Sequence, residues 1–146
     1  MIALLQRVSQ ASVVVDGQTI ARIGRGLLVL LAIQPDDAEP QAQRMVERML
    51  GYRLFADAAG KMNSSLLDLR GELLLVPQFT LAANTDKGMR PSFTSAATPD
   101  MATRWFDRVV ALTTLQHSRV QTGQFGADMQ VALINDGPVT FWLETH

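Results

Sequence analysis

The chain has 146 residues, a formal net charge of −1 and no cysteine. This length suits one domain with a real hydrophobic core, and the lack of cysteine excludes disulfides, thiolate zinc sites and cysteine nucleophiles. Because no apolar run reaches the ~18 residues of a membrane helix, we expect one cytoplasmic domain, residues 1–146, without membrane contact.

The first third of the chain predicts strands followed by a helix. Residues 2–24 have β-strand character, and Asp16-Gly17 is a two-residue hairpin signal. The run "GLLVLLAI" at 26–33 is typical of a strand buried on both faces. Residues 37–51 then carry apolar side chains at helical spacing, with Asp36 or Asp37 as the expected cap and Gly51 as the stop.

The rest of the chain predicts another buried strand, another helix and a final pair of strands. The strand spans 72–81, and its pairing should stop at Pro77 because proline has no N–H. A helix spans 98–113, with Thr98 as its N-cap. The tail predicts two strands separated by Gly137-Pro138. We therefore expect an α+β fold, a mostly antiparallel, barrel-like β-sheet covered by two main helices.

The usual catalytic groups are scarce. The chain has two histidines, and His117, which follows the second helix, is expected on the surface rather than in a catalytic triad. No cluster of His, Asp or Glu has metal-ligand spacing, so no metal site is predicted. The segment "IGRGLL" lacks the rest of a phosphate-loop motif and is interpreted as a hairpin turn between strands.

The stretch "PQFTLAANTDKGMRPSF" at 77–93 remains as a candidate site. It combines an amide, a hydroxyl and two cations, Lys87 and Arg90, beside a strand end. A purely structural alternative places Phe79 and Leu81 in the core and turns Gln78 and Thr80 outward. Similarly, "NDGPVT" at 135–140 could be a simple turn, since Asn, Asp, Gly and Pro favour turns.

Four segments in this order resemble the D-aminoacyl-tRNA deacylase family. They are "QRVSQASV", "FADAAGKMNSS", "QFTLAANTDKGMRPSF" and "NDGPVTFWLET", and they extend over nearly the whole chain. The resemblance implies a homodimeric hydrolase without metal or cofactor, with active sites at the dimer interface. Its substrate would be the 3′ end of tRNA that carries a D-amino acid or glycine.

The resemblance also implies roles for particular residues. Gln78, Phe79 and Thr80 match the segment whose backbone N–H groups polarise the ester carbonyl, and the Thr80 hydroxyl is a candidate nucleophile. Gly137-Pro138 matches a Gly-cis-Pro motif that enters the partner subunit's site and excludes L-amino acids. The usual serine before the glutamine is Pro77 here, so no role of that serine transfers to this chain.

Other matched residues would contact the RNA or support the site. Phe125 lies where the family stacks the terminal adenine, with ordinary core packing as the alternative, whereas Arg7 and Met129 lie where the family braces the motif and the pocket. Lys87 and Arg90 are expected to meet phosphates, because they lie on the loop that leaves residues 78–81.

A threonine without a base is a poor nucleophile at neutral pH. An aminoacyl ester is already activated, however, and brings its own neighbouring ribose 2′-hydroxyl. The protein then needs mainly to orient the ester and to stabilise the oxyanion. Two alternatives are a non-catalytic RNA-binding module on the same fold and a purely structural dimer.

Overall fold

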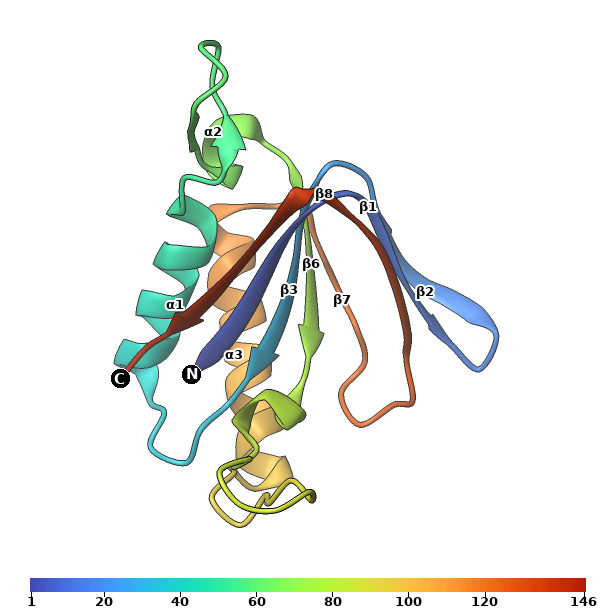
Figure 1. The fold of residues 1–146 in the computed structure, drawn as a ribbon, viewed down its shortest axis with the longest axis vertical. Coiled ribbons are helices and arrows are strands. Elements are labelled where there is room, and N and C mark those ends of the chain that lie inside the picture. Colours follow the sequence, from blue (N-terminus) through green and yellow to red (C-terminus); the bar gives the residue numbers. More distant parts are fainter.

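The computed structural model describes all of residues 1–146, which form one curled main sheet, a small ribbon and four helical segments (Figure 1). The main sheet contains β1 (Ile2–Val15), β2 (Gln18–Ile23), β3 (Gly26–Ala32), β6 (Glu72–Pro77), β7 (Val120–Thr122) and β8 (Gln130–Glu144). The ribbon pairs β4 (Phe55–Ala56) with β5 (Met62–Ser64). The helical segments are α1 (Glu39–Gly51), α2 (Leu66–Leu69), the 3₁₀ turn η1 (Phe79–Ala82) and α3 (Pro99–Gln116).

The long strand β1 organises the sheet. It pairs antiparallel with β8 over most of its length, and its other edge pairs first with β3 and then with β2. The sheet continues through β6 and β7, which run parallel to β3. The predicted α+β, barrel-like sheet is therefore confirmed, but it is mixed, because helix-containing crossovers connect β3 to β6 and β6 to β7.

The segment "IGRGLL" is not a hairpin turn, so that prediction is wrong. Strands β2 and β3 do not pair with each other; both follow the same edge of β1, and Gly24-Arg25 interrupts them. Gly26 opens β3 where β6 comes very close. A Cβ at Gly26 would lie 1.7 Å from the carbonyl oxygen of Glu72, so only glycine allows this approach.

Helices α1 and α3 cover one face of the sheet (Figure 1). The larger apolar core lies between these helices and the sheet, and a smaller one lies where β1, β2 and β8 curl over the other face. Fully burying an aliphatic side chain contributes about 1.5–3 kcal/mol. Both cores include β3 and β6 side chains, and these two strands are therefore fixed from both faces, as the apolar run at 26–33 predicted.

The two long helices lie close to their predicted ranges. In α3 the predicted cap is confirmed, because the Thr98 hydroxyl accepts a hydrogen bond from the N–H of Met101 at 3.3 Å. In α1 the predicted aspartate cap is wrong. The Gln41 side chain accepts from the N–H of Ala38 at 3.0 Å instead, while Asp37 binds the amino group of Met1.

An ion pair joins the two helices on their exposed side. The Arg108 guanidinium in α3 donates to both carboxylate oxygens of Glu39, at distances between 2.7 and 3.2 Å. Hydrogen bonds from Arg108, and then from Gln43, hold the pKa of Glu39 below its ordinary value. This pair connects the first turn of α1 to the middle of α3.

Three further expectations differ from the structure. His117 is only 8% exposed, because the end of α3 packs against the loop before β6, where His117 Nε2 lies 2.7 Å from the Gly71 carbonyl oxygen. The strand predicted at 72–81 is shorter, because the following residues turn into η1, but its pairing with β3 ends at Pro77 as predicted. The tail forms one long strand, β8, with a bulge at 135–139. No helix is long and apolar enough to cross a membrane.

Candidate active site

The sheet ends at Pro77, and the chain turns sharply there. Gln78 makes the last contact with the sheet, since its N–H donates to the Leu31 carbonyl at 2.8 Å. The first hydrogen bond of η1 runs from the N–H of Leu81 to the Gln78 carbonyl at 3.3 Å. The N–H groups of Phe79 and Thr80 precede this bond, so they are free, as the first amides of a helical turn are.

The side chains of this turn point outward. Phe79 is 57% exposed, so the structural alternative that places it in the core is wrong. Gln78 Nε2 donates to the Thr80 hydroxyl, the only side-chain hydrogen bond of that hydroxyl. A carboxamide does not accept a proton at neutral pH, and Thr80 therefore lacks the adjacent base that activates a nucleophile.

The loop between β7 and β8 lies against the end of β6. The N–H of Gly123 donates to the Leu75 carbonyl at 2.8 Å, and the N–H of Gln124 contacts Met129 Sδ at 3.4 Å. A Cβ at Gly123 would lie 2.8 Å from Met129 Sδ and 3.4 Å from Pro77 Cδ. The structure thus brings Met129 and the start of this loop beside Pro77. Phe125, on the same loop, is half-buried and packs against the larger apolar core.

The loop that leaves η1 folds back onto it. Asn84 and Ser92 form an isolated bridge with N–H···O distances of 2.8 and 2.9 Å, and the ring of Phe93 lies 5.1 Å from that of Phe79. Lys87 and Arg90 are exposed on this loop and form no ion pair. Their side chains are therefore accessible to an anion beside the turn, and their predicted contact with phosphates stays a prediction.

A groove of about 540 Å³ borders Thr80. Its lining includes Gln34 from the loop after β3, Asn84, and Trp142 from the exposed side of β8. Trp142 is 51% exposed, which is unusual for such a large apolar side chain. No local sequence pattern marks Gln34 or Trp142, because both come to this groove from parts of the chain that are remote from Thr80.

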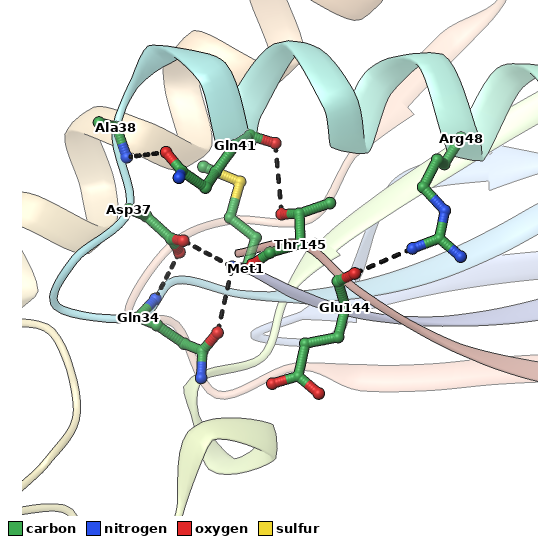
Figure 2. A network of polar contacts seen from close by, with 8 residues as sticks. All are labelled: Met1, Gln34, Asp37, Ala38, Gln41, Arg48, Glu144 and Thr145. Carbon is green, nitrogen blue, oxygen red and sulfur yellow. Dashed lines mark hydrogen bonds and ion pairs between the residues drawn. The ribbon is translucent and has the colours of Figure 1, made fainter.

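A buried polar network supports one wall of this groove (Figure 2). The α-ammonium of Met1 lies 2.6 Å from Asp37 Oδ1 and donates to Gln34 Oε1 at 3.1 Å and to the Thr145 carbonyl at 3.0 Å. The other Asp37 oxygen accepts from the N–H of Gln34 at 2.7 Å. Because breaking a buried ion pair costs about 3–5 kcal/mol, this network fixes the position of Gln34.

Gly137 and Pro138 lie in the bulge of β8 and are exposed. The peptide bond between them is cis, which confirms that prediction. Arg7 holds the bulge from β1: its Nε donates to the Asp136 carbonyl and its Nη1 donates to the Leu54 carbonyl, both at 2.9 Å. The predicted bracing by Arg7 is therefore present within one chain.

The bulge and residues 78–80 lie at opposite ends of the sheet in one chain. Arg7, beside the bulge, pairs with Leu27, whereas Pro77 pairs with Leu31. Four residues along a strand correspond to about 13 Å, and β1 and β3 separate the two segments laterally. Figure 1 shows the bend of β8 and η1 at opposite ends. One chain does not bring these segments together.

Comparisons with known proteins match this chain to one family over nearly its full length. The model of the D-Tyr-tRNA(Tyr) deacylase family matches residues 4–144. A Thioalkalivibrio sulfidiphilus protein named D-aminoacyl-tRNA deacylase is 62% identical, covering 99% of this chain and 97% of that protein. An Escherichia coli protein of the same name is 56% identical, covering 99% of both chains.

The fold has a solved counterpart. The structure of the c-Myc DNA Unwinding Element Binding Protein superposes with a TM-score of 0.96 at 39% identity, covering 100% of this chain and 99% of that one. The matches include the turn after β6, the loop before β8 and the bulge of β8. On these grounds the chain belongs to the D-Tyr-tRNA(Tyr) deacylase family.

Proposed function

We propose that this protein hydrolyses the ester bond between tRNA and a D-amino acid, and that it also acts on glycyl-tRNA. Family membership over residues 4–144 is the observation that carries this proposal. The products are free tRNA and the free amino acid. The proposed substrate is the 3′ end of the aminoacyl-tRNA.

The chemistry of residues 78–80 suits an activated ester. The free N–H groups of Phe79 and Thr80 point from one exposed turn and are the donors that we assign to the developing oxyanion. Removing one such donor typically costs ~10²–10³ in rate. The Thr80 hydroxyl receives a hydrogen bond from Gln78, and it orients rather than attacks, because no base is in contact with it. The neighbouring 2′-hydroxyl of the substrate assists the reaction.

Phe125, Lys87 and Arg90 are assigned to the RNA. Phe125 offers a ring on the loop beside the turn, and base–aromatic stacking contributes ~1–3 kcal/mol. The two cations flank the same turn on the opposite loop and meet backbone phosphates. Met129 lies beside the end of β6, where its Sδ contacts the N–H of Gln124, and we assign it to supporting the loop that carries Phe125.

A second copy of the chain completes the proposed site. Since the bulge at Gly137-Pro138 and residues 78–80 lie at opposite ends of one chain, they meet only if a second copy supplies the bulge. The exposed apolar side chains of Phe79 and Trp142 beside the Thr80 groove suit coverage by that copy. In a two-fold dimer, each bulge reaches the other subunit's site.

The bulge then acts as a chiral filter. Gly137 has no side chain, and Pro138 has no N–H, so the turn presents carbonyl oxygens to the substrate. A carbonyl that faces the α-carbon clashes with an L side chain but admits a D side chain or a hydrogen. Selectivity thus arises from rejection of the wrong hand, which also explains acceptance of glycine.

The direct assay follows ester loss from D-tyrosyl-tRNA and L-tyrosyl-tRNA, each with and without EDTA. We expect fast loss from the D-ester only, with no effect of EDTA. Binding of both tRNAs without turnover would favour the RNA-binding module instead. Activity that EDTA abolishes and zinc restores would contradict the metal-independent chemistry.

A further inference from the structure

The bulge of β8 is open to β1 over most of its length. The ladder between the two strands stops at Asn135 and resumes at Thr140, and only Arg7 of β1 lies between these two pairings. Arg7 holds the first residue of the bulge, through the Asp136 carbonyl at 2.9 Å. The chain that follows Gly137-Pro138 therefore needs another support.

Asn135 supplies that support with both ends of its carboxamide. Its Oδ1 accepts a hydrogen bond from the N–H of Val139 at 2.8 Å, and its Nδ2 donates to the Thr140 hydroxyl at 2.8 Å. A flipped amide would point its own N–H groups at the N–H of Val139, so these bonds fix the orientation of the side chain. Both bonds span the bulge, four and five residues along the chain.

The two residues that Asn135 holds are themselves anchored. Val139 packs against the larger apolar core, and Thr140 pairs with Gln6 of β1. An asparagine that only forms a turn binds its own backbone about two residues further on. Asn135 instead connects the strand before the bulge to the strand after it, and fixed points therefore lie on both sides of Gly137-Pro138.

We propose that Asn135 is a positioning residue for the chiral selectivity of the site, because it holds the bulge in the conformation that rejects L-aminoacyl esters. This inference rests on the proposed function, in which the bulge enters the site of the second copy. Rejection by a clash fails whenever the bulge opens, since an L side chain then finds room. The rate on the L-ester is thus proportional to the open fraction of the bulge, which the two hydrogen bonds of Asn135 keep small.

Three variants and a control separate this role from general stability. Asn135→Ala removes both hydrogen bonds, and Thr140→Val removes the acceptor of one. Asn135→Asp keeps both, because a carboxylate accepts from the N–H of Val139 while the Thr140 hydroxyl rotates and donates to its other oxygen. Gln121→Ala is the matched control: this carboxamide also forms two hydrogen bonds, at 2.8 and 2.7 Å, but it joins β7 to the backbone of Arg22 on β2.

The measured quantity is kcat/KM for L-tyrosyl-tRNA divided by kcat/KM for D-tyrosyl-tRNA, after correction for spontaneous hydrolysis. The net contribution of one hydrogen bond typically shifts an equilibrium by about 2- to 13-fold. The ratio should therefore rise by roughly 5- to 150-fold in Asn135→Ala and by roughly 2- to 13-fold in Thr140→Val. Asn135→Asp and Gln121→Ala should keep the wild-type ratio, although Gln121→Ala should lower Tm.

Amide hydrogen exchange tests the support of the bulge without catalysis. The amides of residues 136–140 should exchange faster in Asn135→Ala than in the wild type or in Asn135→Asp, while those of β3 keep the wild-type rate. Equal exchange at 136–140 in all three proteins would overturn the inference.

The activity outcomes separate this inference from the proposed function. Hydrolysis of the D-ester by the wild type, with an unchanged ratio in folded Asn135→Ala, would overturn the role of Asn135 alone. If Asn135→Ala does not fold, the ratio in Thr140→Val decides in the same way. An equal rise in Gln121→Ala would also overturn it, because loss of stability would then explain the effect. A wild type that hydrolyses neither ester would reject the proposed function, and the selectivity role of Asn135 with it.

Discussion

Replacing Gly137 with alanine should lower activity on every substrate, including glycyl-tRNA. The added Cβ would lie 2.8 Å from Val139 Cγ2 and 3.0 Å from Arg7 Nη2. Ordinary carbon contacts are about 3.5–4.0 Å, so the bulge must move by several tenths of an ångström. The methyl group also fills space that the substrate needs.

The expected losses of stability and of activity follow from backbone strain and from displacement of the bulge. Gly137 has a φ of 138°, which L side chains rarely adopt, and such strain costs about 1–3 kcal/mol. In a domain of this size, that corresponds to a decrease in Tm of roughly 3–10 °C. Misplacement of a site by about 1 Å can reduce the rate ~10²-fold, and we expect a loss of kcat/KM of this order.

Gly17→Ala is the matched control. Gly17 also has a positive φ, 76°, but a Cβ there meets no atom within 4 Å, and it lies in the turn between β1 and β2. Both variants should lose stability, whereas only Gly137→Ala should lose activity. The measurements are Tm and kcat/KM for D-tyrosyl-tRNA and glycyl-tRNA. If Gly137→Ala remains as active as Gly17→Ala, the assigned role of the bulge is wrong.

Three further predictions concern the turn, the RNA end and the helix pair. Phe79→Pro should reduce kcat ~10²–10³-fold more than Phe79→Ala, because only proline removes the amide donor. Thr80→Ala should lose less activity than Phe79→Pro. An acyl-Thr80 adduct found by mass spectrometry would contradict the main-chain mechanism. Phe125→Ala should raise KM for D-tyrosyl-tRNA by roughly 5- to 150-fold, equivalent to ~1–3 kcal/mol of stacking. Unchanged kinetics in a folded variant would show that Phe125 does not bind the substrate. Hydrogen bonds from Arg108 hold the pKa of Glu39 below 4.5, so the stability from this pair is present above 4.5 and is lost as pH falls through the lowered pKa of the folded state. Glu39→Gln should therefore lower Tm at neutral pH, and its difference from the wild type should shrink as the pH falls below 4.5. A difference in Tm that does not change with pH would refute the ion-pair origin.

Local features of the fold could be predicted from the sequence. Helical spacing located α1 and α3, and Thr98 caps α3 because its hydroxyl needs only a neighbouring N–H. Long-range pairings could not be predicted in the same way. Aspartate commonly caps helices, but Asp37 binds the amino group of Met1, which is distant from it in the sequence. His117 is buried because the loop before β6 reaches it, and no local pattern encodes that contact.

The candidate site also contains some residues that a local pattern reveals and others that only the folded chain brings together. Residues 78–80 could be found because they form one contiguous segment at a strand end. Gln34 and Trp142 could not, since they approach Thr80 only after β3 and β8 are placed in the sheet. The register of β1 also separates the Gly137-Pro138 bulge from Pro77 within one chain. That separation depends on strand pairing, which periodicity alone does not determine.

A site shared between two copies of the chain is tested most directly by mixing two inactive variants. Gly137→Ala damages the bulge, Phe79→Pro damages the turn, and a mixed dimer has one site with an intact bulge from one copy and an intact turn from the other. Random exchange after co-refolding should restore about a quarter of wild-type activity, because half of the two-fold dimers are mixed and each has one intact site. Activity no higher than the sum of the separate variants, despite confirmed mixed dimers, would contradict a site built from two chains.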